Sequence, residues 1–207
     1  MYVPPTFAVA DLRELHDIIR ASRLGFLVTR SSGELQSSPL PLFLDPEEGE
    51  YGTIYGHLAR ANPQWNSPVE GEAMALFMGP NAYITPSWYP TKAATGKVVP
   101  TWNYVAVEAH GPAEFFEDPE RLREVVTRLT RIYEQPRDQP WAVSDAPPDF
   151  IKSQLRGIVG IRMPVVRIDG KRKMSQNRSA EDRAGVIDGL SRSDNPQDVV
   201  VSSLVPR

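Results

Sequence analysis

The chain has 207 residues, of which 41% are hydrophobic and 24% charged, and its formal net charge is −3. This composition is typical of a globular protein, and the length is sufficient for one substantial core. No apolar run approaches the roughly 18 residues that a membrane-spanning helix needs, and the N-terminal segment lacks the features of a secretory signal. The absence of cysteine excludes disulfides, thiolate metal sites and cysteine nucleophiles. We therefore expect a cytoplasmic protein without a membrane segment.

The first third of the chain predicts a helix followed by paired strands. Apolar residues recur at helical spacing over residues 11–21. A β-rich segment at 24–30, a Ser-Ser-Gly turn and a second strand over 34–45 predict a hairpin. Pro39 and Pro41 lack N–H groups, so we expect this second strand to be poorly paired and to face a ligand. A further strand is predicted over 52–59, followed by a turn or short helix that begins at Asn62.

The middle of the chain predicts more β-structure. Residues 72–80 and 82–90 flank the turn signal Gly79-Pro80-Asn81, which predicts a second hairpin. A long strand from residue 98 is expected to turn at Gly111 and to return over a short strand.

The last part of the chain predicts mainly helices. We expect helices over 119–134, 151–157 and about 180–190, with one strand over 158–171. Residues 191–207 are expected to form a loose polar tail, and Leu204 to Arg207 match the residues left after thrombin removes a tag. Residues 1–190 thus predict one mainly β domain, a small barrel of six or seven short strands with added helices.

Several kinds of chemistry lack their usual sequence signals. The three histidines, His16, His57 and His110, are scattered without an i,i+4 pair, which argues against a metal site. No Gly-x-Ser-x-Gly nucleophile elbow, Walker loop or Gly-x-Gly-x-x-Gly run is present. A hydrolase triad, a metal centre and a dinucleotide fold of the common type are therefore not expected.

Three segments carry candidate binding groups, each with a simpler alternative. Residues 56–65 place His57, Arg60 and Asn62 at the start of a turn, which suits either a phosphate cradle or a solvated loop. The ring-rich segments 84–92 and 98–107 suit an interface with a planar ligand, or simply a core. The basic residues of 170–178 favour a solvated turn over contacts with an anion.

The chain resembles the PaiB family of FMN-binding proteins, which are described as negative transcriptional regulators and belong to the split-barrel class that includes pyridoxamine phosphate oxidase. The resemblance rests on six stretches that recur in order from residue 1 to about residue 190. They read MYVPPTF, GHLARANPQW, GPNAYITPSWYPTK, VVPTWNYVAV, IVGIRM and KMSQNR.

The resemblance implies a fold and a site. The fold would be a Greek-key split β-barrel of about six strands that forms a homodimer, with one FMN per subunit in the groove between the two copies. Where many members carry a histidine in the second strand, this chain carries Pro39. The implied flavin-site residues are Ser37, Ser38, Pro39, Leu40, His57, Arg60, Asn62, Lys92, Trp102, Asn103, Lys173, Ser175 and Gln176.

Three functions remain open at this point. The resemblance favours an FMN-binding negative transcriptional regulator. An FMN-dependent oxidoreductase is the second possibility, with His57 and Lys92 as the best candidates for a proton donor or acceptor. A dimeric, flavin-independent binder of small molecules is the third. The sequence pI of about 5.7 does not indicate a DNA-binding surface, although the basic stretch from Lys171 to Arg178 leaves DNA binding open.

Overall fold

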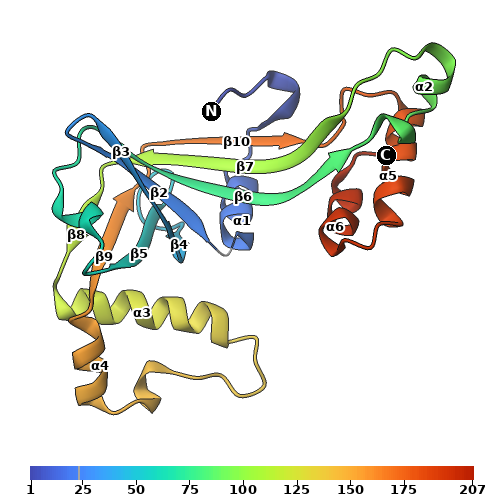
Figure 1. Cartoon of the computed structure of the whole chain (residues 1–207). Helices are drawn as coiled ribbons and strands as arrows, with labels where there is room; N and C mark the ends of the chain where they lie inside the picture. The colour runs from blue at the N-terminus through green and yellow to red at the C-terminus, as the bar shows by residue number, and fades with distance from the viewer. Residues whose placement is uncertain (23) are drawn as a thin grey trace. The chain divides into compact units, whose positions relative to one another are not determined.

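The computed structural model of the chain describes residues 1–22 and 24–207 and is mainly β with added helices, as the sequence predicts (Figure 1). The described residues group into two compact units. The first unit comprises residues 1–18, 78–107 and 169–207. The second unit comprises residues 19–77 and 108–168. The prediction of one domain over residues 1–190 stays a prediction.

The described residues form ten strands, six α-helices and four short 3-10 helices. The strands are β1 (Ala8–Val9), β2 (Gly25–Ser31), β3 (Glu34–Leu40), β4 (Leu42–Asp45), β5 (Thr53–Ala59), β6 (Ala73–Ile84), β7 (Thr101–Gly111), β8 (Glu114–Phe116), β9 (Ile158–Pro164) and β10 (Arg167–Lys173). The α-helices are α1 (Leu12–Ala21), α2 (Pro90–Thr95), α3 (Pro119–Glu134), α4 (Pro148–Leu155), α5 (Ala180–Ser191) and α6 (Pro196–Leu204). The 3-10 helices are η1 (Pro5–Phe7), η2 (Pro63–Asn66), η3 (Pro86–Trp88) and η4 (Val143–Asp145).

The second unit is organised by antiparallel pairing. The predicted hairpin of β2 and β3 is confirmed, with Gly25 opposite Leu40 and Ser31 opposite Glu34. Its two-residue turn places Ser32 and Gly33 at positive φ, the geometry that matches the twist of a hairpin. A separate four-stranded sheet has the order β4-β5-β9-β8.

The second predicted strand changes sheet at Pro41. The sequence predicted one strand over 34–45, whereas the chain forms β3, which is an edge strand paired with β2, and then β4, which pairs with β5. Pro41 has no N–H with which to continue the ladder. Gly56 of β5 accommodates the bend, because a Cβ there would lie 2.9 Å from the Pro41 carbonyl oxygen. The predicted strand over 158–171 is likewise divided, into β9 and β10.

The prediction of a hairpin at Gly79-Pro80-Asn81 is wrong, because one continuous strand, β6, runs through these residues. The pairing of β6 with β2 ends at Phe77, so Pro80 lies where no β2 partner needs its missing N–H. Gly79 is required by close packing, since a Cβ there would lie 3.1 Å from the Val105 Cβ atom of β7. The turn signal is thus overridden by packing.

The predicted turn at Gly111 exists, but β8 does not return along β7. It pairs with β9 instead, with Phe115 opposite Ile161. Gly111 passes so close to β9 that a Cβ would lie 1.9 Å from the Pro164 carbonyl oxygen. The chain therefore leaves one sheet and enters the other at this glycine.

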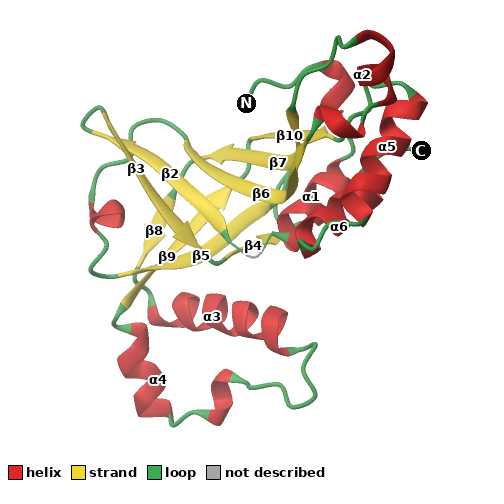
Figure 2. Ribbon diagram, turned by 45° about the vertical axis from the view of Figure 1, so that its right-hand side comes forward, coloured by secondary structure: helices red, strands yellow, loops and turns green. Residues whose placement is uncertain are grey.

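Helix α3 covers the four-stranded sheet and supplies much of the core of the second unit. It begins after Asp118, whose carboxylate accepts a hydrogen bond from the Arg121 amide at 2.9 Å. Leu122, Val125 and Leu129 recur at helical spacing and are buried. Burying each such side chain contributes about 1.5–3 kcal/mol. Helix α4 packs beside α3 in both views (Figures 1 and 2).

The first unit contains the strand pair β1–β10, followed in the sheet by β7 and β6, together with the C-terminal helices. Helix α5 confirms the prediction for residues 180–190. It presents Gly189 to the indole of Trp88, where a Cβ would lie 2.3 Å from the ring. The prediction of a loose polar tail over residues 191–207 is wrong, because α6 packs against α5 through Val201, which is fully buried. Val205 is also buried, and the thrombin interpretation of the last four residues stays a prediction.

Among the described residues, no helix is both long and apolar enough to span a bilayer.

Candidate functional site

The residues implied for a flavin site fall into two groups, one in each unit. The second unit holds seven of them, Ser37, Ser38, Pro39, Leu40, His57, Arg60 and Asn62. The first unit holds the other six, Lys92, Trp102, Asn103, Lys173, Ser175 and Gln176. Each group has its own local geometry, which decides what its side chains can offer to a ligand.

Ser38 and Asn62 are brought together in the second unit. Asn62 ends the turn after β5, where its carboxamide oxygen accepts from the Gln64 amide at 3.0 Å and thereby caps η2. Its Nδ2 donates to the Ser38 hydroxyl on β3 at 2.7 Å. The segment 37–40 alternates along the edge strand, with Ser38 and Leu40 buried and Ser37 and Pro39 exposed. Polar groups thus line this edge in a fixed arrangement.

His57 lies on β5, opposite Gly160 of β9. Burial lowers the pKa of the imidazole below its usual value of 6.5, so the ring is neutral at neutral pH. Its Nδ1 atom is buried and has no hydrogen-bond partner among the described residues. A buried, unpaired ring nitrogen is unfavourable, and a ligand group that hydrogen-bonds to it would remove that cost.

Arg60 is already fully engaged within the second unit. Its guanidinium pairs with the Glu117 carboxylate, and its Nε donates to the Arg156 carbonyl at 2.6 Å. The indole of Trp65 also donates to the Arg60 carbonyl at 2.8 Å, which fixes the backbone at this position. A role of Arg60 at a phosphate stays a prediction, and it would require exchange of the Glu117 partner.

Asn103 and Ser175 form a buried pair in the first unit. Asn103 on β7 is fully buried, and its Nδ2 donates to the Ser175 Oγ atom at 3.0 Å. Ser175 follows β10 and has a φ of 60°, in the left-handed region that non-glycine residues seldom adopt. Such backbone strain persists only where the surrounding contacts hold it, and it is common near ligands. The pair therefore fixes the turn after β10.

Lys173 lies at the end of β10 and is held against β7. Its Nζ donates to the Thr101 hydroxyl and, at 2.6 Å, to the Trp102 carbonyl. Burial lowers the pKa of this ammonium group, and the positive charges of Lys171 and Arg178 lower it further. The positive charges of Lys171, Lys173 and Arg178 thus lie close enough together for the first and last to act on Lys173. An anion would find a favourable field here.

The other predicted residues of the first unit differ in what they contact. Gln176 braces its own turn, because its side chain accepts from the Met174 amide and donates to the Arg172 carbonyl, both at 2.6 Å. Trp102 is 53% exposed and packs edge-on against Tyr83. Lys92 lies on α2, where its Nζ donates to the Ser87 hydroxyl at 3.3 Å. Within the described residues, no hydrogen bond or ion pair joins Lys92 to the Lys173 turn.

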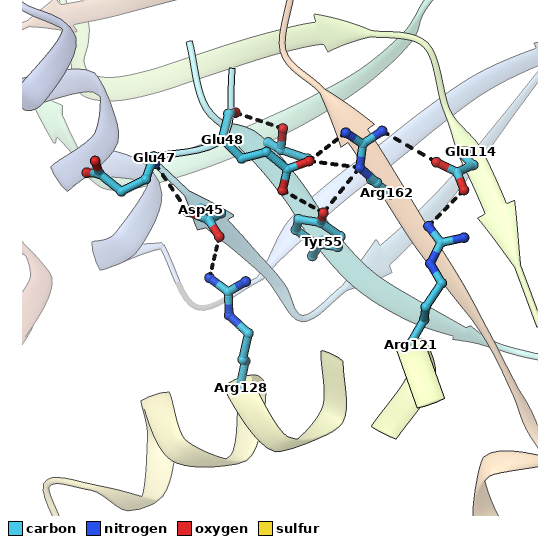
Figure 3. Close-up of polar contacts among 9 residues, drawn as sticks. Asp45, Glu47, Glu48, Tyr55, Glu114, Arg121, Arg128 and Arg162 are labelled. Atoms are coloured by element: carbon cyan, nitrogen blue, oxygen red, sulfur yellow. Dashed lines mark hydrogen bonds and ion pairs between the residues drawn. The ribbon is translucent and has the colours of Figure 1, made fainter. Parts of the chain in front are cut away.

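An ionic network in the second unit was not predicted from the sequence. Arg162 on β9 donates from Nη2 to Glu48 at 2.5 Å and from Nε to the Tyr55 hydroxyl at 3.2 Å (Figure 3). The Tyr55 hydroxyl donates to the second Glu48 oxygen at 2.6 Å. Burial would raise the pKa of Glu48, but these hydrogen bonds and the Arg162 charge outweigh it and leave the pKa lowered.

Two arginines of α3 extend this network to the helix. Arg121 pairs with Glu114 at 2.7 Å, and Glu114 also faces Arg162 (Figure 3). Arg128 pairs with Asp45 at 2.8 Å, and its guanidinium lies 4.6 Å from the centre of the Phe43 ring. The network therefore ties α3 to β4 and β8 and has a structural role. The signal for this network in the sequence was Arg162, a charged residue inside the strand-like stretch IVGIRM.

Each group by itself offers side chains that suit part of a phosphorylated planar ring such as FMN. The Lys173 turn offers several neighbouring positive charges. Trp102 and Tyr83 offer exposed aromatic surface. His57 offers a buried nitrogen that lacks a partner. In the first unit these features suit the phosphate and the faces of a flavin, and in the second unit His57 suits its polar edge.

Comparison with protein families and relatives gives consistent results. Residues 1–167 match the family model described as "Putative FMN-binding domain". Over 197 residues the chain is 36% identical to "Protease synthase and sporulation protein PAI 2" of Bacillus subtilis, a match that covers 95% of this chain and 92% of the relative.

Solved structures share the fold at low sequence identity. The FAD and heme binding protein of Mycobacterium smegmatis superimposes with a TM-score of 0.62 at 12% identity, covering 86% of this chain and 78% of that one. The flavocytochrome Anf3 of Azotobacter vinelandii gives a TM-score of 0.57 at 13% identity, covering 86% of this chain and 75% of that one. At such identities the likeness concerns the fold alone, and it confirms the predicted split-barrel fold.

Proposed function

The chain belongs to the FMN-binding family whose model matches residues 1–167, and from this premise we propose that it is an FMN-binding regulator that represses transcription. The family match and the 36% identity to the Bacillus protein confirm the resemblance to the PaiB family. They also support flavin binding, FMN included. The regulatory role rests on the resemblance, and the sporulation name of the Bacillus relative is in keeping with it.

We assign flavin contacts to each group of residues separately, beginning with the group in the first unit. Lys173, with Lys171 and Arg178, supplies the positive field for the phosphate, because the charges of Lys171 and Arg178 lie close enough to lower the pKa of Lys173. Trp102 supplies an exposed ring for the flavin surface. Asn103 and Ser175 hold the turn that presents Lys173.

The second unit supplies polar groups of another kind. Ser37 to Leu40 offers an edge strand beside the ring, with Ser38 oriented by Asn62. His57 offers a neutral imidazole whose buried Nδ1 hydrogen-bonds to a polar atom of the ligand. Lys92 and Gln176 are engaged with Ser87 and with their own turn, so we give them supporting roles.

We further propose that the protein acts as a cytoplasmic homodimer. Three large apolar side chains of the first unit, Tyr83, Val99 and Trp102, are 48%, 65% and 53% exposed. Tyr83 and Trp102 pack edge-on and so form a contiguous exposed apolar patch, the kind of surface that marks an interaction site and that a second copy of the chain would cover. Sedimentation equilibrium tests this directly: a mass of two chains supports the dimer, and a single-chain mass at micromolar concentration refutes it.

The decisive observation for the function is the family match across most of the chain, and a binding experiment tests it. Purified protein titrated with FMN should turn yellow and show saturable binding in the visible spectrum. A gel shift with promoter fragments, with and without FMN, then tests repression. Binding of a specific fragment supports the regulatory function, whereas no shift either with or without FMN contradicts it.

An FMN-dependent oxidoreductase is the second candidate, favoured by the buried neutral His57 as a proton donor or acceptor. When bound, FMN supplies hydride and electron transfer. Addition of NAD(P)H separates the two functions: rapid bleaching of the flavin supports the enzyme, and an unchanged spectrum supports the regulator. Failure to take up FMN at all would favour a flavin-independent binder.

A further inference from the structure

A cavity of about 400 Å³ lies in the second unit between α3, α4 and the end of β5. Its volume falls within the range of small-molecule sites, roughly 300–1,000 Å³. Of the implied flavin residues, only Arg60 lines it. We propose that this α3–α4 cavity is a second ligand site, separate from the flavin site, that binds a small organic anion with an apolar body.

The charges around the cavity favour an anion. Its lining includes four basic residues, Arg60, Arg123, Lys152 and Arg156, and two acidic ones, Glu117 and Glu120. The Arg60–Glu117 ion pair accounts for one charge of each sign. Three cations and one carboxylate remain, which leaves a net charge of +2 at the cavity.

The remaining cations are not held by other groups. Within residues 1–22 and 24–207, no ion pair involves Arg123, Lys152 or Arg156. Their side chains are therefore available to a ligand, and like charges around one cavity repel each other until an anion is bound.

Helix dipoles explain only part of this arrangement. Lys152 lies in the last turn of α4 and Arg156 directly follows that helix, so both complement the negative end of its dipole. The helix dipole does not explain the positive charge of Arg123, because this residue lies near the N-terminal end of α3, where the dipole favours negative charge. A bound anion would be stabilised by this end of α3 and by the cations of both helices.

The floor of the cavity is apolar. Pro119, which is exposed at the start of α3, lines it together with Leu122 and Leu155, whose side chains lie almost fully buried beneath it. An inorganic anion would leave the exposed Pro119 ring uncovered, whereas an alkyl or aryl group would bury it at roughly 25 cal/mol per Å². The ligand therefore combines an anionic head, phosphate or carboxylate, with an apolar body.

The helix that forms one wall is fixed in place. Arg121 and Arg128 tie α3 to Glu114 and Asp45 on the sheet (Figure 3). These two residues do not line the α3–α4 cavity. The wall is thus held from its other side, and a ligand does not have to order it on binding.

Isothermal titration of the full chain with phenyl phosphate, in the presence of saturating FMN, tests the proposal. We expect saturable binding, and binding about tenfold or more weaker for inorganic phosphate and for phenol, since each lacks one half of the recognition. Phenylacetate, which carries a carboxylate on an aryl body, distinguishes a general anion site from one that prefers phosphate.

Matched variants locate the site. Arg123→Gln and Lys152→Gln should each weaken phenyl phosphate binding by about tenfold or more, as expected for loss of a charge-assisted hydrogen bond. Arg131→Gln removes the same charge from α3 outside this cavity and should leave binding unchanged. Circular dichroism confirms that each variant is folded.

Three results would overturn the proposal: no saturable binding, unchanged binding in both variants, or competition between FMN and phenyl phosphate. The last would mean that the cavity is part of the flavin site. FMN binding by the same protein, measured separately, stays a test of the proposed function alone, so the two ideas can fail independently.

Discussion

Replacement of Lys173 by methionine tests the assignment of the phosphate contact. Methionine keeps the length and the apolar stem of lysine but removes the charge. A hydrogen bond to a charged group contributes about 1.5–3 kcal/mol, so the affinity for FMN should fall roughly 10- to 150-fold. The folded protein without flavin should change little in stability. The bonds to Thr101 and Trp102 are lost, but the cost of burying the charge beside Lys171 and Arg178 is relieved.

Fluorescence titration measures this effect, because flavin emission changes when the ring is bound. Riboflavin lacks the phosphate, so Lys173→Met should leave its affinity nearly unchanged. Lys97→Met, an exposed lysine of the same unit, is the matched control and should bind FMN like the wild type. Equal FMN affinities for Lys173→Met and wild type would refute the assignment, as would an equal loss for riboflavin.

Three other changes test the structure more broadly. Because the pKa of Glu48 is lowered in the folded state, the stabilisation by its carboxylate is present above pH 4.5 and is lost as the pH falls through the folded pKa. Glu48→Gln should therefore make the free energy of unfolding depend less on pH below pH 4.5, as measured by circular dichroism. His57 also has a lowered pKa in the folded state, so as the pH falls below 6.5 the unfolded chain binds a proton before the folded chain does and the protein loses stability. His57→Gln should remove this loss, measured by thermal melts below pH 6.5. Gly111→Ala forces a Cβ to 1.9 Å from the Pro164 carbonyl oxygen and should cost about 1–3 kcal/mol, measured by urea unfolding.

Local patterns in the sequence were sufficient for most elements. The helical spacing of apolar residues predicted α1 and α3, and the cap at Asp118 gave the start of α3. Ser32 and Gly33 marked the β2–β3 turn correctly, because a tight hairpin requires positive φ there. These features depend on interactions between residues close in the chain.

Errors arose where distant contacts decide the conformation. Gly79-Pro80-Asn81 reads as a turn, yet Gly79 is a glycine because Val105 packs against its backbone. The tail after residue 190 reads as polar, yet Val201 of α6 is fully buried. No local pattern reveals such partners.

The candidate site shows the same division. Motifs of the family indicated both the Lys173 turn and Asn103, and the structure shows Asn103 hydrogen-bonded to Ser175 of that turn. They did not reveal that Arg60 pairs with Glu117, a residue 57 positions away. Nor did they indicate the α3–α4 cavity, since it is formed by two helices that meet only in the folded chain.

The most direct test of the account is the equilibrium affinity of the flavin-free protein for FMN, measured beside its affinity for riboflavin. We predict saturable binding of FMN, and binding of riboflavin that is weaker by roughly tenfold or more because the phosphate contacts are missing. No saturable uptake of FMN would contradict the central claim.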